Sequence, residues 1–336
     1  MPERNINPHD HAAGVEPGDR DVVTGTRDTA MAERARDMVA LVPNERGLAA
    51  LSTVAGVRPI RYDVTASLPE EAAEAEVMVV PSRPVDRLLA LIDELPSLRL
   101  VQTLSAGTDQ WTGRLPDRVA LSNARGAHGI AVAEWAAAAL LAFYRGIPAY
   151  AADQETGRWK PRATESLSGK KVLILGAGDL GTLLRARLEP FGAHVTMVAR
   201  HARQDIRAMD DLPSLLPEHD VVALMVPLTD ATHHLAGKDF LSRMRDGAIL
   251  INAARGPVVD TMALLAETQS GRLRAILDVT EPEPLPADNP LWRSPGVLIT
   301  PHVAGDVPEA DDRAWQVAAT QIGQFASGKR PDNLVS

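Results

Sequence analysis

The 336-residue sequence contains no cysteine, which excludes disulfides, thiolate catalysis and cysteine-ligated metal sites. Cysteine usage therefore carries no information on the redox compartment. No apolar run reaches the ~20 residues that span a bilayer, and the longest, at residues 131–144, is interrupted by Glu134. The sequence also has no excess of basic residues, as its net charge of -9 shows. We therefore expect neither a general nucleic-acid-binding protein nor a membrane protein.

The N-terminal stretch also lacks the apolar core of a signal peptide. It is rich in Pro, Gly, Asp and Arg, a composition that predicts a disordered extension over residues 1–35. With neither a targeting nor a membrane segment, we expect the protein to be cytoplasmic.

One stretch carries a strand, a glycine turn and a helix in immediate succession. The apolar run Val172–Leu175 predicts a buried strand that leads into Gly176, Gly178 and Gly181. Apolar residues then recur at helical spacing, and a second strand is predicted over His194–Ala199. Because the G-x-G-x-x-G pattern lies between a predicted strand and a predicted helix, it predicts a dinucleotide-binding site.

Each glycine has a separate role in that interpretation. Gly176 makes the tight turn, Gly178 lets the backbone approach the pyrophosphate, and Gly181 lets the helix pack against the strand. The phosphates would bind the free N–H groups of the helix N-terminus, at Asp179 and Leu180. The alternative is an ordinary strand-turn-helix in which the glycines serve packing only.

The end of the second predicted strand bears on which dinucleotide is bound. An acidic residue there would suit the ribose 2′-hydroxyl of NAD, whereas arginine suits the 2′-phosphate of NADP. The sequence has Ala199 followed by Arg200 and Arg203, without a carboxylate. We therefore predict that NADP is preferred and that NAD is an alternative; both arginines could instead be solvated on a surface loop.

The rest of the chain alternates short apolar strands with helical patterns. The helices expected before the glycine turn include Leu48–Val54 and Ala131–Tyr144, and a polar crossover is expected over Asp153–Ser168. This alternation predicts an α/β fold with parallel sheets, organised as two domains.

Distinctive polar residues follow several of the predicted strands. Ala106 and Gly107 lie in a small-residue loop that could hold a carboxylate, or that could be a plain turn with Asp109 as a cap. Arg255, Asp278, Glu283 and His302 follow later strands, whose carboxyl ends share one edge if the sheet is parallel.

Together these side chains suit the interconversion of a 2-hydroxy acid and a 2-oxo acid. Histidine exchanges a proton near neutral pH, so His302 is the candidate acid and base. Glu283 would favour its imidazolium form, Arg255 would bind the substrate carboxylate, and Asp278 would accept from the nicotinamide carboxamide. Each residue alone also has a structural explanation. The spacing of the other histidines indicates no metal site.

Several motifs in order resemble the D-isomer-specific 2-hydroxyacid dehydrogenases, specifically the glyoxylate and hydroxypyruvate reductases. The motifs are Gly176–Gly181, Val226–Thr229, Asn252–Gly256, Asp278–Pro284 and Thr300–His302. The resemblance covers about residues 38–327 and implies that Arg255, Glu283 and His302 are catalytic. It also implies that Val226, Pro227, Ala253 and Asp278 contact the cofactor, and that Ala106 and Gly107, with Arg255, bind the substrate carboxylate.

The resemblance further implies the domain arrangement. Two Rossmann-like domains are expected, with a nucleotide-binding domain (126–303) inserted into a discontinuous, flavodoxin-like substrate domain (36–125 and 304–336). It implies a homodimer joined through the nucleotide domains, with the helix from Ala131 at the contact. Because the sequence ends shortly after Asn333, we expect no C-terminal regulatory domain. Trp135 stands where many members have histidine.

The sequence thus predicts an NADP-preferring oxidoreductase that acts on a small 2-oxo acid such as glyoxylate or hydroxypyruvate, without a metal. Two alternatives stay open. A formate or phosphite dehydrogenase has the same fold, although formate enzymes place Gln where Glu283 stands. A dinucleotide-sensing regulator shares both the fold and the catalytic residues.

Overall fold

The computed structural model of the protein describes residues 37–335. The extension predicted over residues 1–35 lies outside the described residues. The described chain contains two parallel sheets, one of five strands and one of seven. The prediction of two α/β domains with parallel sheets is therefore confirmed.

The five-stranded sheet is formed by the N-terminal part of the described chain. Its strands are β1 (Met38–Val42), β2 (Val57–Arg61), β3 (Val77–Val80), β4 (Leu100–Thr103) and β5 (Ala120–Ser122). Their spatial order, β2-β1-β3-β4-β5, is the flavodoxin-like order. Helices α1 (Glu45–Leu51) and α2 (Val85–Asp93) connect these strands.

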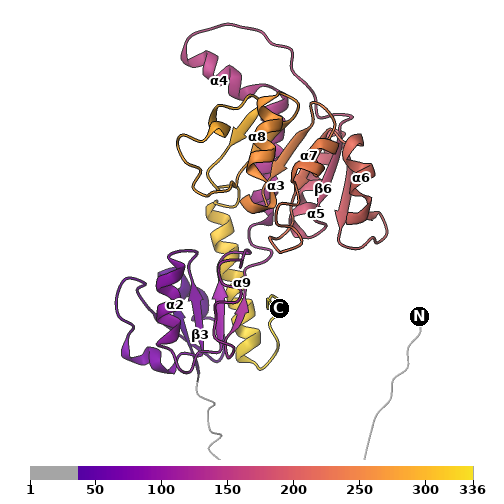
Figure 1. Cartoon of the computed structure of the whole chain (residues 1–336). Helices are drawn as coiled ribbons and strands as arrows, with labels where there is room; N and C mark the ends of the chain where they lie inside the picture. Colours follow the sequence, from indigo (N-terminus) through magenta and orange to yellow (C-terminus); the bar gives the residue numbers. More distant parts are fainter. Residues whose placement is uncertain (1–36, 336) are drawn as a thin grey trace, which may run out of the picture. The chain divides into compact units, whose positions relative to one another are not determined.

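The last helix, α9 (Pro308–Ala326), returns to this first sheet (Figure 1). Its side chains Trp315, Ala318 and Ile322 are buried in one hydrophobic cluster with residues of β1 and β3. A helix from the C-terminal part of the chain therefore packs against the sheet formed by the N-terminal part.

The seven-stranded sheet contains the glycine turn. Its strands are β6 (Lys171–Leu175), β7 (His194–Ala199), β8 (Ile206–Ala208), β9 (Val221–Leu224), β10 (Ile249–Asn252), β11 (Arg274–Leu277) and β12 (Val297–Ile299). Its helices are α3 (Gly129–Tyr144), α4 (Ile147–Glu155), α5 (Asp179–Leu188), α6 (Leu212–Leu215), α7 (Lys238–Arg243) and α8 (Thr261–Gln269).

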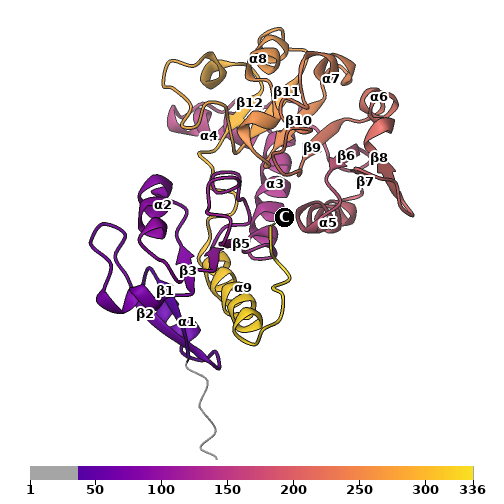
Figure 2. The ribbon, with the colours of Figure 1, turned by 60° about the horizontal axis from the view of Figure 1, so that its bottom comes forward.

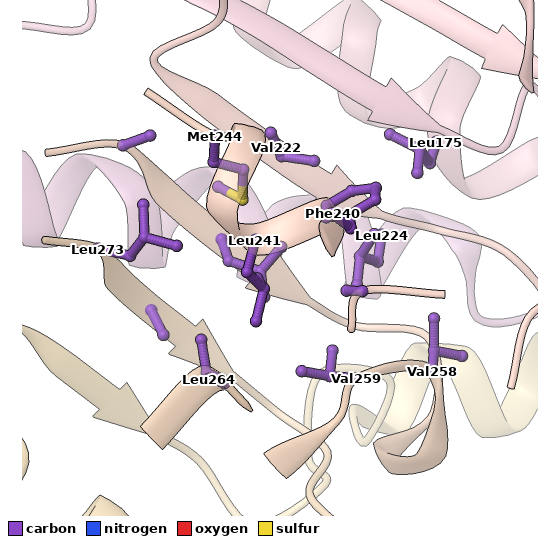
Figure 3. Packing of buried hydrophobic residues seen from close by; sticks show 14 of the residues in the cluster. Leu175, Val222, Leu224, Phe240, Leu241, Met244, Val258, Val259, Leu264 and Leu273 are labelled. Atoms are coloured by element: carbon purple, nitrogen blue, oxygen red, sulfur yellow. The ribbon is translucent and has the colours of Figure 1, made fainter. Parts of the chain in front are cut away.

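Alternate residues of the central strands enter two separate cores, one on each face of this sheet. Leu173 and Leu175 pack with α7 and α8, where Phe240, Leu241 and Leu264 lie close to the strands (Figure 3). Val172 and Ile174 face the opposite side and pack with α3 and α5, which lie against each other (Figure 2). Burial of both faces explains why these strands are continuous apolar runs.

The order of the seven strands is β12-β11-β10-β9-β6-β7-β8, and every pairing is parallel. The carboxyl ends of β6, β10, β11 and β12 therefore lie on one edge, as the sequence predicted. The order reverses between β6 and β9, and such a switch point is where open α/β sheets bind ligands.

Some local predictions were wrong. The helix expected over Leu48–Val54 instead spans Glu45–Leu51, because the Asn44 side chain accepts from the N–H of Gly47 at 3.0 Å and caps it there. The polar crossover expected from Asp153 begins inside α4. Strands β5 and β8 and helix α9 were not predicted.

Among the described helices, none alone is long and apolar enough to cross a membrane. Taken together, helices α3 and α4 have the length and composition of a membrane-spanning segment, but they meet at a bend of 67°.

Candidate functional site

The glycine turn after β6 is tight and closely packed. Gly176 has φ +110°, and its N–H donates to the carbonyl of Val198 at 2.8 Å. A Cβ on Gly181 would lie 1.9 Å from the carbonyl oxygen of Gly176, so the helix could not approach the strand with any larger residue. These two glycines have the geometry that a dinucleotide turn requires.

The turn also leaves room for an anion at the start of α5. Gly178 is the N-cap residue and offers no side chain to the first N–H groups of the helix, at Asp179 and Leu180. A Cβ on Gly178 would meet nothing within 4 Å, so the space beside this N-cap residue is open. The described residues therefore fit a pyrophosphate at this helix N-terminus.

The two arginines after β7 lie at the same edge of the sheet as the glycine turn, because β6 and β7 are parallel. Arg203 donates from Nη2 to the carbonyl of Ala177, inside the turn, at 3.1 Å. Arg200 is exposed directly after Ala199, the last residue of β7. A guanidinium thus contacts the glycine turn directly, and the predicted 2′-phosphate site stays a prediction.

The loops after β9 and β10 carry the other predicted cofactor residues. Val226 packs against the hydrophobic core, and the Pro227 carbonyl accepts from Thr232 Oγ1 at 2.6 Å, which fixes the loop. Ala253 is half-buried against the opposite core. Both loops lie on the edge of the sheet that carries the glycine turn.

His302 and Glu283 form a direct hydrogen-bonded pair. Nδ1 of the histidine lies 2.7 Å from Oε1 of the glutamate, so the carboxylate fixes the orientation of the ring. Within residues 37–335, no protein group bonds Nε2, which leaves that nitrogen free to exchange a proton with a ligand. His302 has φ +57°, an uncommon conformation for a residue with a side chain, of the kind that concentrates at functional sites.

Asp278 holds the loop that carries His302. Its carbonyl accepts from the His302 N–H at 2.7 Å, and its carboxylate accepts from Thr300 Oγ1 at 2.6 Å, Val303 N at 2.9 Å and Ala304 N at 3.0 Å. The side chain is buried, with the residue 3% exposed. The predicted contact with a nicotinamide carboxamide stays a prediction; the hydrogen bonds present show a positioning role that the sequence did not indicate.

Arg255 lies opposite the loop after β4. Its Nε donates to Asp109 Oδ1 at 3.0 Å and its Nη1 donates to the Ala254 carbonyl at 2.7 Å. The Asn252 side chain donates to the Arg255 carbonyl at 3.0 Å, which shapes the backbone at this strand end. A Cβ on Gly107 would lie 1.4 Å from Arg255 Nη2, so only glycine allows this approach.

The substrate-side loop is ordered by its own polar groups. Asn123 Nδ2 donates to the Ala106 carbonyl at 3.0 Å, and Ser105 Oγ donates to the Gly107 carbonyl at 2.9 Å. With these carbonyls engaged, the loop keeps a fixed shape beside the arginine.

A cleft of 690 Å³ joins these groups. Its walls include predicted residues from both sheets, namely Gly107, Arg255, Asp278, Glu283 and His302. The structure therefore brings the three proposed catalytic side chains together.

The cleft also contains residues that the sequence did not indicate as part of a site. Asp109, considered only as a cap, is the ion-pair partner of Arg255 at 3.0 Å. Arg83, from the loop after β3, lies with its Nη2 3.8 Å from Glu283 Oε1. Trp292 lines the wall and donates from Nε1 to the Pro286 carbonyl at 2.9 Å. Arg83 and Trp292 have no local sequence pattern that could have identified them.

A glycine turn at the switch point of a parallel sheet shares its edge with a hydrogen-bonded histidine–glutamate pair and an arginine. This is the arrangement of a dehydrogenase that uses a nicotinamide dinucleotide. The sequence profile of the D-isomer specific 2-hydroxyacid dehydrogenase NAD-binding domain matches residues 137–304. The chain belongs to the D-isomer specific 2-hydroxyacid dehydrogenase family.

Individual relatives agree with this assignment. The chain is 34% identical over 299 residues to a glyoxylate/hydroxypyruvate reductase B of Klebsiella pneumoniae, covering 84% of this chain and 92% of the relative. A family member from Aeromonas salmonicida has a similar structure, with a TM-score of 0.80 at 28% identity, covering 89% and 99% of the two chains. An NADPH-dependent glyoxylate/hydroxypyruvate reductase of Sinorhizobium meliloti, solved with NADP and malonate, gives 0.74 at 26% identity, covering 90% and 97%.

Proposed function

We propose that this enzyme reduces a small 2-oxo acid, such as glyoxylate or hydroxypyruvate, with NADPH as the preferred reductant. The observation that carries the proposal is the His302–Glu283 pair, at 2.7 Å, in the same cleft as Arg255. This reduction requires three groups from the protein: a proton donor, a group that orients the donor, and a cation that binds the substrate carboxylate.

Each side chain has a separate task in the proposed reaction. The guanidinium of Arg255 binds the substrate carboxylate, and the N–H groups of the Ala106–Gly107 loop lie beside it. His302 Nε2 gives a proton to the oxygen at C2, while Glu283 stabilises the imidazolium through Nδ1. Asp278 keeps the His302 loop in place. The dinucleotide supplies the hydride when it is bound.

A preference for NADPH is supported by charge at the end of β7. Arg200 and Arg203 follow Ala199, so the position that would need a carboxylate for NAD carries an apolar residue beside two cations. The contact of Arg203 with the glycine turn holds one of these cations near the phosphates. The Sinorhizobium meliloti relative is described as NADPH-dependent.

The proposal is tested by initial rates with glyoxylate, hydroxypyruvate, pyruvate and a bulky aromatic 2-oxo acid, each with NADH and NADPH. We expect the highest kcat/KM with NADPH and one of the first two substrates. Replacing both arginines, as Arg200→Gln with Arg203→Gln, is expected to lower kcat/KM with NADPH by ~10-fold or more and to leave NADH nearly unchanged, because only NADPH loses charge-assisted hydrogen bonds.

Arg207→Gln is the matched control for that double variant, because Arg207 is an exposed arginine of β8. An equal loss with both cofactors would contradict the assigned role of the two arginines. Tight NADPH binding without turnover of any 2-oxo acid would contradict the proposed reaction and favour a sensing role. Turnover of formate or phosphite instead would favour those dehydrogenases.

We also propose that the protein is a homodimer that includes α3 and α4 at the contact. Trp159, which follows α4, is 96% exposed, and Ile147 at the start of α4 is 54% exposed. A contact with another chain would bury these apolar side chains. Analytical ultracentrifugation should give a dimer for the natural protein and a weaker dimer for Trp159→Ser. A monomer at micromolar concentration would refute this proposal.

A further inference from the structure

Two loops at the edge of the seven-stranded sheet bring together three metal-binding side chains. His233 and His234 lie in the loop after β9, and Glu281 lies in the loop after β11. His234 Nε2 is 2.9 Å from Glu281 Oε2, and one ligand atom from each of the three residues lies within 4.8 Å of the others.

The backbone conformation explains how two consecutive histidines face the same side. His234 has φ +49°, a left-handed conformation that is uncommon for residues with a side chain. The two imidazoles consequently stack, with their centroids 4.1 Å apart and an interplanar angle of 28°. In an extended strand, neighbouring side chains would point to opposite faces.

The backbone around these side chains is fixed from both sides. The N–H of His233 donates to the Thr229 carbonyl at 2.8 Å, and the N–H of His234 donates to the Pro257 carbonyl at 2.8 Å. The carbonyl of Glu281 accepts from Thr261 Oγ1 at 2.8 Å. The three side chains project from ordered backbone, and the exposure of both imidazoles leaves them room to adjust their rotamers around an ion.

A simple ion pair would need only His234 and Glu281, which are already hydrogen-bonded. Such a pair does not explain why His233 lies beside them. Two imidazoles and one carboxylate form the ligand set of protein zinc sites that have three protein ligands and a water molecule in the fourth position. Imidazole nitrogen favours zinc, cobalt, nickel and copper, whereas magnesium and calcium favour oxygen ligands. The chemistry therefore selects a divalent transition metal.

We propose that His233, His234 and Glu281 form a binding site for one divalent transition-metal ion of the zinc class. The ion joins the loop after β9 to the loop after β11. None of the three side chains lines the cleft of the candidate site. The residue that contacts His302 is Glu283, not Glu281. The site is thus separate from the proposed reaction, and it can exist whether or not the reductase assignment is correct.

The test uses the full chain, freed of metal and titrated with Zn²⁺ by isothermal calorimetry and with Co²⁺ by visible absorption. We expect one ion per chain and the intense absorption of Co²⁺ with fewer than six ligands. His234→Ala and Glu281→Gln are each expected to weaken binding by at least ~10-fold, because losing even an outer-shell partner of a ligand commonly costs that much. His233→Ala should weaken it similarly.

Two controls separate this site from other histidines. His194→Ala removes an exposed histidine at the start of β7 and should leave the titration unchanged. His9→Ala with His11→Ala removes the only other closely spaced histidines of the sequence and should likewise retain the ion. Loss of binding in the His9/His11 variant, undiminished binding in His234→Ala and Glu281→Gln, or no binding by the natural chain would overturn the proposal.

Discussion

Replacing His302 with alanine is expected to lower kcat for 2-oxo acid reduction by ~10²–10⁴-fold, the usual contribution of a positioned acid or base. The side chain is the only predicted proton donor in the cleft, and its Nδ1 is already bonded to Glu283. NADPH affinity should change little, because the phosphate-binding residues lie at the glycine turn. Steady-state rates and fluorescence titration with NADPH measure the two effects separately.

The conformation of His302 requires a second variant. Its φ of +57° is unfavourable for alanine, so His302→Ala could disturb the loop as well as remove the imidazole. His302→Gly removes the same ring in a residue that accepts this conformation. His194→Ala is the matched surface control. Near-normal turnover in both His302 variants would refute the assignment, whereas loss in the alanine variant alone would indicate a backbone effect.

The sequence predicted the parts of the site that are encoded locally. The glycine turn follows from three residues whose spacing is set by one strand and one helix, and the structure gives Gly176 and Gly181 the expected close contacts. The ends of β10, β11 and β12 were placed on one edge because parallel pairing forces them there. These inferences need only periodicity and the geometry of parallel sheets.

Contacts between segments far apart in the sequence could not be predicted in the same way. The pair formed by Asp109 and Arg255 depends on how the first sheet faces the second, and no local pattern encodes it. Asp278 lines the cleft as predicted for a ligand contact, and its carboxylate also accepts from the N–H groups of Val303 and Ala304, which local sequence did not indicate. The return of α9 to the first sheet is another contact without a local pattern, and only the family resemblance implied that residues 304–336 belong with this sheet.

Short elements with little apolar pattern were missed for a different reason. Strand β8 has three residues, Ile206–Ala208, and lies at the edge of the sheet, where none of its side chains is fully buried. Its pairing with β7 stabilises it more than its own composition does. The His233–His234–Glu281 cluster was also invisible in sequence, since Glu281 lies 47 residues beyond His234.

Arg255→Gln is the other variant with a large expected effect, a loss of ~10²–10³-fold in kcat/KM. Removing one charged donor at a reacting centre commonly has this cost. Arg255→Lys keeps the charge but loses the planar fork, so its loss should be smaller, about 10–100-fold. The measurement is kcat and KM for glyoxylate or hydroxypyruvate at saturating NADPH, with Arg243→Gln, an exposed arginine paired with Asp239, as the matched control.

The ion pair with Asp109 makes this prediction sharper. Asp109 Oδ1 accepts from Nε at 3.0 Å, whereas Nη2 points to the backbone of Gly107, where a Cβ would lie 1.4 Å away. If Arg255 binds the substrate carboxylate, Gly107→Ala should resemble Arg255→Gln by displacing the guanidinium, and Asp109→Asn should have a much smaller effect. If Arg255 instead serves only to hold the two sheets together through Asp109, Asp109→Asn should be as damaging as Arg255→Gln, and unfolding should occur at a lower temperature in both. A large loss in kcat/KM for Arg255→Gln and Gly107→Ala, without a change in the unfolding temperature, therefore distinguishes substrate binding from a structural role.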